Sequence, residues 1–538
     1  MKKRLNKSDL RQGFCYYLLA TLALALIFFS YIFRGASTDM MTPIGWIYFS
    51  ASCLTHAAIL LLIPFLLIQL PLAMLGLRQR WANGVLVVVY GLLFILAVAN
   101  SYVYAIYHFH INGLVLEMLT GPGASEIFVF SFWVYAKAIA LSLLLMGVSG
   151  ALAWLSHKLT KRRQQRHYWR NRLLPLLCIG LFSQAAHIYG SATMNAALVE
   201  SSDVIPYYFP LRANKLLVKL GVTDNRKMSQ LHFKSAGAAV NYPLHPLKIQ
   251  QPEKPLNIVI LCIDSWNPRT LTTECTPNIC HFAQQAEQYS QHLSSSNGTR
   301  GGIFGMFTGL PAYYWKSFEY ADIQPLLTEQ LLKAGYNRFQ PSWEYCDYMK
   351  LSNDIDPTPF FNLYRNCVAE VDSLIGLTLD KLKQKNLLQN TVVIITGDHG
   401  QEFNENHNNY WGHSSNYSEW QTRTPLIYYY PGCKPGKRDY RTTHYDLSPT
   451  LLHQVVGVTN PPSDFSTGHY LSDRAPRNWH LAGNDLYYAF TLTDGTIVEK
   501  RGSGSLKVLD RRMRPMPNYQ LNARELQEAL RNMNRFFK

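Results

Sequence analysis

An Asp and a His stand side by side at the end of an apolar run, as Asp398 and His399. The run, residues 391–397, is continuous and mostly β-branched, which is typical of a strand covered on both faces in a parallel sheet. A second such run, residues 256–263, also ends in a carboxylate, Asp264. Functional groups collect at the carboxyl ends of strands in open α/β sheets, and carboxylate and imidazole groups together bind hard or borderline cations. We therefore expect these three side chains to hold a divalent metal ion, Mg, Mn or Zn.

A Thr follows a run of small polar residues, at position 299, and precedes the apolar segment 303–307. This order indicates a loop that leads into a helix, with Thr299 at or near the helix N-terminus. Backbone N–H groups and the helix dipole favour anions there, so a nearby cation would help the Thr299 hydroxyl act as a nucleophile. Arg300 would then meet the non-bridging oxygens of a phosphate. The other interpretation of Thr299 is a helix N-cap, the commoner role of Thr in such a place.

Three further histidines lie near the Asp-His pair or downstream of it. His413 follows closely enough to share the site, whereas His407 and His444 are expected to be ordinary polar loop residues. Residues 424–431 predict the next buried strand, and residues 444–452 open a helix.

The elements that must position these residues alternate between strands and helices over residues 252–473, which favours a doubly wound α/β sheet. The tail, residues 522–538, is typical of an amphipathic helix that packs on the domain. The domain is therefore expected to cover residues 252–538.

The first two hundred residues have a different character. Hydrophobic residues make up 48% of the 538-residue chain, and they are concentrated there in long apolar stretches. The length of each stretch is near or above the roughly 20 residues that a helix needs to cross a bilayer. The five stretches are residues 14–33, 46–75, 85–107, 127–155 and 173–188. Pro64 and Pro71 predict that the second is kinked or tilted, and Gln184 and His187 predict that the fifth faces other helices.

Basic residues predict the orientation of these spans. They are concentrated in the N-terminal tail and in two loops on the same side: Lys2, Lys3, Arg4, Lys7, Arg11; Arg78, Arg80; Lys158, Lys161, Arg162, Arg163, Arg166, Arg170 and Arg172. The positive-inside rule places that side in the cytoplasm, and five spans then deliver the chain after about residue 190 to the periplasm of a bacterial inner membrane. The predicted organisation is a transmembrane domain (1–190), an interfacial connector (191–251) and a periplasmic domain (252–538).

The net charge of +16 suggests an anionic partner. Nucleic acid is not expected, because the densest basic cluster borders a membrane face. Anionic phospholipid at the cytoplasmic face is the simpler partner, and a topology signal without bound lipid is the alternative.

The connector contains spaced cations next to apolar residues. From Arg212 to Gly221 the pattern predicts a short amphipathic helix, suited to a membrane interface. Arg212, Lys215 and Lys219 would hold the phosphates of a lipid headgroup, or would simply solvate a linker helix.

Six of the nine cysteines fall in the exported part. An oxidising compartment permits disulfides there, and Cys275 and Cys280 could close a small loop. Cys262 lies in a predicted core strand and is expected to be a buried thiol.

Taken together, Ile263–Asp264, Asn297–Gly298–Thr299, Thr396–Gly397–Asp398–His399–Gly400 and Gly412–His413 resemble the sulfatase-like branch of the alkaline phosphatase superfamily. The resemblance implies a metal bound by Asp264, Thr299, Asp398 and His399, with His413 on the substrate side. The chain lacks the Cys-x-Pro-x-Arg context of formylglycine sulfatases. It also has no His between His292 and His399, where the related transferases carry one.

The whole chain resembles a narrower group, the YejM family (also called PbgA or LapC) of Gram-negative inner-membrane proteins. The five spans, Tyr208–Phe209–Pro210–Leu211–Arg212–Ala213, Asn241–Tyr242–Pro243–Leu244 and Gly302–Ile303–Phe304–Gly305–Met306–Phe307 carry this resemblance.

This resemblance implies that the connector senses lipopolysaccharide by recognising the lipid A part of that molecule. It also implies regulation of lipopolysaccharide synthesis, and so of outer-membrane homeostasis, through a LapB-like partner that works with the protease FtsH. The alternative function is a metal-dependent phosphoesterase or phosphotransferase that acts on membrane lipid headgroups through Thr299. The intact Asp-His pair keeps this hydrolase or transferase activity open.

Overall fold

The computed structural model covers the whole chain and divides it into two compact units, Met1–Asn225 and Arg226–Lys538. The residues that it describes are 7–34, 41–69, 71–72, 79–107, 110–112, 132–162, 170–193, 195–222, 238–336, 356–484, 487–500, 506–516, 519 and 523–538. Parts of the predicted basic tail and loops, the start of the fourth predicted span and Cys346 lie outside these residues. The two units are described separately below.

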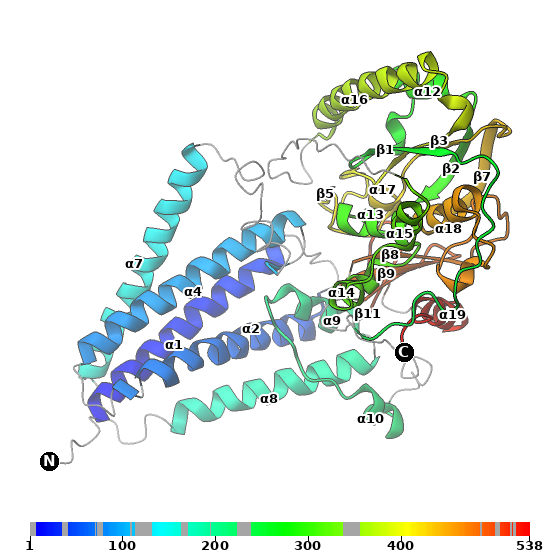
Figure 1. Cartoon of the computed structure of the whole chain (residues 1–538). Coiled ribbons are helices and arrows are strands. Elements are labelled where there is room, and N and C mark those ends of the chain that lie inside the picture. Colours follow the sequence, from blue (N-terminus) through cyan, green and yellow to red (C-terminus); the bar gives the residue numbers. More distant parts are fainter. Residues whose placement is uncertain are drawn as a thin grey trace. The chain divides into compact units, whose positions relative to one another are not determined.

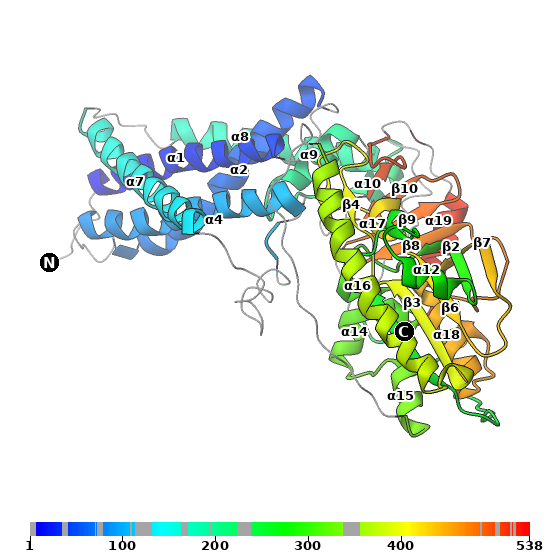
Figure 2. The same cartoon turned by 90° about the horizontal axis from the view of Figure 1, so that it is seen from above.

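Five long helices build the first unit, and each has an apolar segment long enough to cross a membrane. They are α1 (Lys7–Ser30), α2 (Pro43–Pro64), α4 (Gln79–Tyr107), α7 (Phe132–Arg162) and α8 (Arg170–Thr193). The apolar segments are Leu10–Phe33, Pro43–Gln69, Ala82–Ala105, Phe132–Lys161 and Leu173–Thr193. Figures 1 and 2 show α1, α2 and α4 side by side in one bundle. These helices confirm the five predicted spans.

Two details of the spans follow the sequence closely. The α-helical hydrogen bonding of α2 ends at Pro64, after which the chain forms a π-helical turn, η2 (Phe65–Gln69). In α8, His187 is fully buried and its Nδ1 lies 3.0 Å from the hydroxyl of Tyr48, so this span faces a neighbouring helix as expected.

After α8 the connector forms α9 (Ala196–Val204) and α10 (Asn214–Lys219). The second is the predicted short helix, and the chain leaves it at Gly221 with a φ of +73°, a conformation that favours glycine. In the first unit, the three-residue 3-10 turn η1 (Tyr31–Phe33) follows α1 and precedes α2.

A five-stranded mixed sheet forms the centre of the second unit, in the order β1-β3-β6-β2-β7. Its strands are β1 (Asn257–Ile263), β2 (Glu287–Leu293), β3 (Thr391–Gly397), β6 (Leu426–Tyr429) and β7 (Gly436–Thr443). The pairs β1–β3 and β2–β7 are parallel, and β6 runs antiparallel to both of its neighbours. The α/β fold is confirmed, with one antiparallel strand that the sequence pattern did not reveal.

Helices cover both faces of this sheet (Figure 1). On one face lie α12 (Pro277–Ala283) and α16 (Thr358–Gln384); on the other lie α13 (Thr299–Thr308), α15 (Leu326–Lys333) and α18 (Leu447–Leu451). Side chains of β3 point alternately to the two faces of the sheet. Val393 and Ile395 pack in the core under α12 and α16, and Val392 and Ile394 pack in the core under α13, α15 and α18. The apolar run at residues 391–397 is therefore continuous because both of its faces are buried.

A smaller antiparallel sheet completes the unit, in the order β11-β10-β9-β8. Its strands are β8 (Trp479–Gly483), β9 (Tyr488–Leu492), β10 (Ile497–Lys500) and β11 (Leu506–Leu509). The tail helix α19 (Ala523–Met533) buries Leu526, Leu530 and Met533 against it, as its amphipathic pattern predicts. Short turns join these elements: η3 (Pro268–Thr270), η4 (Ala312–Tyr314), α14 (Trp315–Tyr320), η5 (Leu388–Asn390), α17 (Glu419–Thr422), η6 (His444–Asp446), η7 (Leu452–Val456) and η8 (Pro462–Asp464).

Two cysteine predictions are wrong. Cys262 is exposed rather than buried, because β1 is an edge strand of the sheet that the structure describes. Cys275 and Cys280 are free thiols, and the Sγ atom of Cys275 instead contacts the carbonyl oxygen of Arg365 at 3.3 Å.

Candidate metal centre

The pairing of β1 with β3 brings the predicted metal ligands together. Ile263 pairs with Gly397 in parallel register, so the next residues along each strand, Asp264 and Asp398, leave the same edge of the sheet as neighbours. Ligand atoms of Asp264, Asp398 and His399 all lie within 4.8 Å of one another. The Nε2 atom of His399 is 3.3 Å from Asp398 Oδ2 and 3.8 Å from Asp264 Oδ1. Two carboxylates and an imidazole at these separations are a donor set suited to a divalent cation.

Hydrogen bonds direct the remaining lone pairs of this cluster at one point. Asp398 Oδ1 accepts from the backbone N–H groups of Ser265 and His399, both at 2.9 Å. Its Oδ2 is buried and has no hydrogen-bond partner among the described residues. His399 Nδ1 donates to the carbonyl oxygen of Gly400 at 2.9 Å, which leaves the lone pair of Nε2 facing Oδ2. When Asp398 is ionised, two lone pairs face each other here and repel, and a cation bound between them would turn that repulsion into attraction.

The electrostatics of the cluster agree with this fit. Burial raises the pKa of Asp398 to about 7, and the neighbouring charge of Asp264 adds to the increase. Burial lowers the pKa of His399 below its usual value and lowers the pKa of His413 to about 4. The imidazoles are therefore neutral ligands at pH 7, and the buried carboxylate lacks the positive charge that would keep it ionised.

Thr299 is the first residue of α13, and the N-cap residue is Gly298. The hydroxyl of Thr299 is thus not used as an N-cap. It is exposed to solvent and lies 3.3 Å from His399 Nε2. The structure therefore combines an accessible hydroxyl, a helix N-terminus and the metal cluster, as the nucleophile interpretation requires.

A close contact fixes α13 against the metal cluster. A Cβ atom placed on Gly302 would lie 2.2 Å from the carbonyl oxygen of Asp398, so only glycine permits this approach. The hydroxyl of Ser294 donates to the same carbonyl oxygen. The backbone of Asp398 is thereby held from two sides, which orients its side chain.

His413 joins the cluster and Arg300 does not. The ring of His413 lies 4.3 Å from that of His399, and its Nδ1 is 3.2 Å from Gln401 Oε1. The guanidinium of Arg300 lies over the ring of Trp315, 4.9 Å from its centroid. The structure thus brings together five of the six predicted site residues and directs Arg300 toward α14.

The sequence analysis missed a buried carboxylate that lies between His399 and His413 in the sequence. Glu402, in the short strand β4 (Glu402–Phe403) that pairs with β5 (Trp411–Gly412), is fully buried. Its carboxylate oxygens accept hydrogen bonds from four side chains, at 2.7 to 3.3 Å: Asn406, Asn416, Ser418 and Gln421. Burial raises the pKa of Glu402 to about 7. No local pattern in the sequence distinguishes this residue from an exposed loop acid.

His444 is buried, so its prediction as a polar loop residue is wrong. It lies in η6, where β7 runs into the core, and its ring is 5.1 Å from that of the buried His292. His480 on β8 is buried close by, and burial lowers the pKa of both His444 and His480 to about 3. His407 is exposed, as expected.

The predicted lipid-binding residues lie in the connector of the first unit. Arg212 is half-buried just before α10, and Lys219 is exposed at its end. The side chain of Lys215 lies outside the described part of the structure.

Comparison with known proteins gives two family models that match in order. A domain of unknown function, DUF3413, matches residues 1–249, and a sulfatase domain matches residues 340–458. The inner membrane protein YejM of Salmonella typhimurium is 22% identical over 510 residues, which cover 85% of this chain and 86% of that protein. An uncharacterized protein of Haemophilus influenzae is 23% identical over 527 residues, with coverages of 87% and 86%.

Among solved structures, the integral membrane lipooligosaccharide phosphoethanolamine transferase A of Neisseria meningitidis is 13% identical. The match covers 85% of this chain and 98% of that one, with a TM-score of 0.48.

The spans, the sheet and the sulfatase match define a multi-pass bacterial inner-membrane protein with a periplasmic domain of the alkaline phosphatase superfamily. Within that class, the chain is similar over most of its length to the YejM inner membrane proteins, at 22% identity.

Proposed function

We propose that this protein senses lipopolysaccharide at the periplasmic side of the inner membrane and regulates lipopolysaccharide synthesis. The observation that carries the proposal is the way the connector returns along the spans. The carbonyl oxygen of Pro206 accepts from His56 Nε2 at 2.9 Å, and the hydroxyl of Tyr208 lies 3.0 Å from that of Ser183. The backbone N–H of Leu211 donates to Gln184 Oε1 at 2.8 Å.

These partners lie well inside the span. Gln184 precedes the end of α8 at Thr193 by nine residues, a distance of roughly 13 Å along a helix with a rise of 1.5 Å per residue. In the proposed arrangement the connector therefore lies at the depth of lipid rather than of bulk water. Phe209 and Leu211 are 71% and 65% exposed there, beside the half-buried Arg212.

Exposed apolar side chains next to a cation at this depth suit a ligand that combines acyl chains with phosphate groups. Lipid A, the anchor of lipopolysaccharide, has that chemistry. In the proposed arrangement, Phe209 and Leu211 contact acyl chains while Arg212, Lys215 and Lys219 bind phosphate. Occupancy of the connector would be passed on to a LapB-like regulatory protein, and the basic cytoplasmic loops would bind anionic phospholipid.

We also propose that the centre of the periplasmic domain retains a divalent cation, Mg, Mn or Zn. Asp264, Asp398 and His399 would hold it, supported by the unpartnered Asp398 Oδ2 and by the neutral Nε2 of His399. When bound, such an ion supplies Lewis-acid chemistry and lowers the pKa of a coordinated hydroxyl.

A second candidate function is a phosphoesterase or phosphotransferase acting on lipid headgroups. It is favoured by one observation, the exposed hydroxyl of Thr299 at the N-terminus of α13, 3.3 Å from His399 Nε2. In this function Thr299 Oγ1 would attack phosphorus, and the proton lost by Thr299 would leave with the departing alcohol.

One experiment separates the two functions. Lipopolysaccharide abundance is measured in cells that depend on this protein and carry either Arg212→Ala or Thr299→Ala combined with Asp398→Asn. A sensor predicts lost control with Arg212→Ala and normal control with the double variant. Lys254→Ala, which removes an exposed cation outside the connector, is the matched control. Lost control in the double variant, with the protein present and folded in the membrane, would instead support the enzyme.

A further inference from the structure

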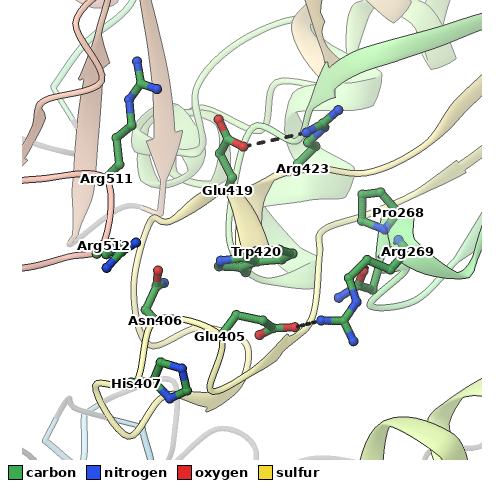
Figure 3. Close-up of a pocket in the computed structure, with 11 residues that line it drawn as sticks. Pro268, Arg269, Glu405, Asn406, His407, Glu419, Trp420, Arg423, Arg511 and Arg512 are labelled. Carbon is green, nitrogen blue, oxygen red and sulfur yellow. Dashed lines mark hydrogen bonds and ion pairs between the residues drawn. The ribbon is translucent and has the colours of Figure 1, made fainter. Parts of the chain in front are cut away.

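A large pocket lies in the periplasmic domain apart from the metal cluster. Its volume is about 750 Å³, within the range of small-molecule sites, and none of the metal-cluster residues lines it (Figure 3). Its walls come from the turn after β1, the loop that follows β4, α17 and the turn after β11. These segments are far apart in sequence, so only the fold creates the pocket.

The pocket is lined by more positive than negative charge. It has four arginines, Arg269, Arg423, Arg511 and Arg512, and two glutamates. Both glutamates already have partners, since Glu405 lies 2.7 Å from Arg269 and Glu419 lies 3.7 Å from Arg423.

Arg511 and Arg512 differ from the other two arginines. Among the described residues neither forms an ion pair with a carboxylate, and Arg511 donates a hydrogen bond to the backbone carbonyl oxygen of Asp494, at 3.3 Å, while its charge helps to lower the pKa of the Asp494 carboxyl. Both side chains are exposed. Arg511 and Arg512 are neighbours in the sequence at one wall of the pocket, and guanidinium groups are suited to bidentate hydrogen bonding with phosphate oxygens.

An aromatic surface lies between the charged walls. Figure 3 shows the ring of Trp420 in the middle of the pocket, with Arg511 and Arg512 on one side and Arg269 on the other. Trp420 is half-buried, so part of the indole is available for contact. The C–H face of a sugar ring packs well on an indole, and the exposed Glu419 offers a carboxylate to hydroxyls nearby.

We propose that this pocket binds a phosphorylated saccharide, with the sugar ring on Trp420 and the phosphate at Arg511 and Arg512. The ligand is either a free sugar phosphate or the headgroup of a glycolipid. This site is separate from the lipid site proposed in the connector, and it does not depend on that proposal.

The structure also offers a close control for the test. The backbone N–H groups of Arg512 and Arg514 both donate to Asp510 Oδ1 at 2.8 Å, so the two arginines share one turn. Both side chains are exposed, but only Arg512 lines the pocket. Replacing either with Ser leaves the turn intact and removes a single positive charge.

The test uses the purified full-length protein in detergent micelles and calorimetric titration with glucose 6-phosphate, glucose and inorganic phosphate. We expect glucose 6-phosphate to bind with a dissociation constant of 1 mM or below and at least ten times more tightly than the other two probes. Arg512→Ser should weaken binding at least tenfold, Arg514→Ser less than twofold, and Trp420→Leu at least fivefold. Circular dichroism checks that the Trp420→Leu protein is folded, and Arg512→Ser tests the site if it is not.

Three outcomes would overturn the proposal: no binding of glucose 6-phosphate at 10 mM, equal weakening by Arg512→Ser and Arg514→Ser, or equal affinities for glucose 6-phosphate and inorganic phosphate. Capture of purified lipopolysaccharide by the same variants, each also carrying Arg212→Ala to weaken the connector site, identifies the source of the ligand. Parallel loss of both ligands with Arg512→Ser supports a glycolipid headgroup. Loss of glucose 6-phosphate alone supports a free sugar phosphate.

Discussion

Replacing Gly302 with Ala should damage the metal centre although Gly302 is not a metal ligand. The added Cβ atom would lie 2.2 Å from the carbonyl oxygen of Asp398, and real Cβ atoms essentially never approach closer than 3.0 Å. The backbone of Asp398 or the start of α13 must therefore move by at least 0.8 Å. Because Asp398 and Thr299 lie on the two sides of this contact, either movement changes the distance between ligand and hydroxyl.

The expected magnitudes follow from the kind of contact. Overpacking of a well-packed core typically costs about 1–3 kcal/mol, and the free energy of unfolding should fall by that amount. Disturbing a group that orients a metal ligand typically weakens metal binding about 10- to 100-fold. Gly302→Ala should therefore bind Mn²⁺ or Zn²⁺ at least tenfold more weakly than the unsubstituted protein.

The assay is calorimetric titration of the purified protein in detergent with each metal ion, together with denaturant unfolding. Gly298→Ala is the control, because its Cβ would meet the hydroxyl of Ser414 at 2.8 Å, a group that can rotate away, and its φ of −160° is open to any residue. Equal metal affinities for folded Gly302→Ala and Gly298→Ala proteins would refute this account of the contact. Absence of metal binding by the unsubstituted protein would refute the metal centre itself.

Three other perturbations test the rest of the structure. Burial lowers the pKa of His444 and His480 to about 3 and the pKa of His292 well below its usual value, so the unfolded chain takes up protons that the folded chain does not. Stability should fall as the pH drops below about 6.5, by up to about 4 kcal/mol per pH unit in denaturant titrations; a flat profile from pH 6.5 to 5 would contradict this. Burial raises the pKa of Glu402 to about 7, so its contribution to stability declines as the pH rises from 4.5 to about 7. Glu402→Gln should remove that decline, and an unchanged pH slope would contradict the assignment. Tyr208→Phe removes the hydroxyl contact with Ser183, worth about 1 kcal/mol, and should raise the rate of protease cleavage in the connector several-fold; equal cleavage rates would show that this contact does not hold the connector.

Local patterns in the sequence were enough to predict the spans and the strands that carry the candidate metal ligands. A membrane helix is recognisable from some 20 apolar residues because lipid imposes that length, and a strand covered on both faces must be apolar throughout. The runs at 256–263 and 391–397 therefore predicted β1 and β3 together with the carboxylates at their ends. The glycine and polar residues before Thr299 similarly predicted the start of α13.

Features that depend on contacts between distant segments were decided only by the tertiary structure. The register of β1 against β3, the reversed direction of β6 and the edge position that exposes Cys262 all follow from strand pairing, which no local pattern encodes. The buried carboxylate of Glu402 is similar, since its four donors come from the loops before and after β5 and from α17.

The candidate metal centre depends both on local sequence patterns and on the tertiary structure. Residue types and strand ends identified Asp264, Asp398 and His399 from the sequence, because such ligands follow strands in this class of sheet. Only the folded chain showed that Gly302 holds Asp398 in place and that Arg300 packs on Trp315 instead. Burial and close approach depend on the packing of the whole domain. A sequence pattern therefore reveals them only where they require the same type of residue at regular intervals.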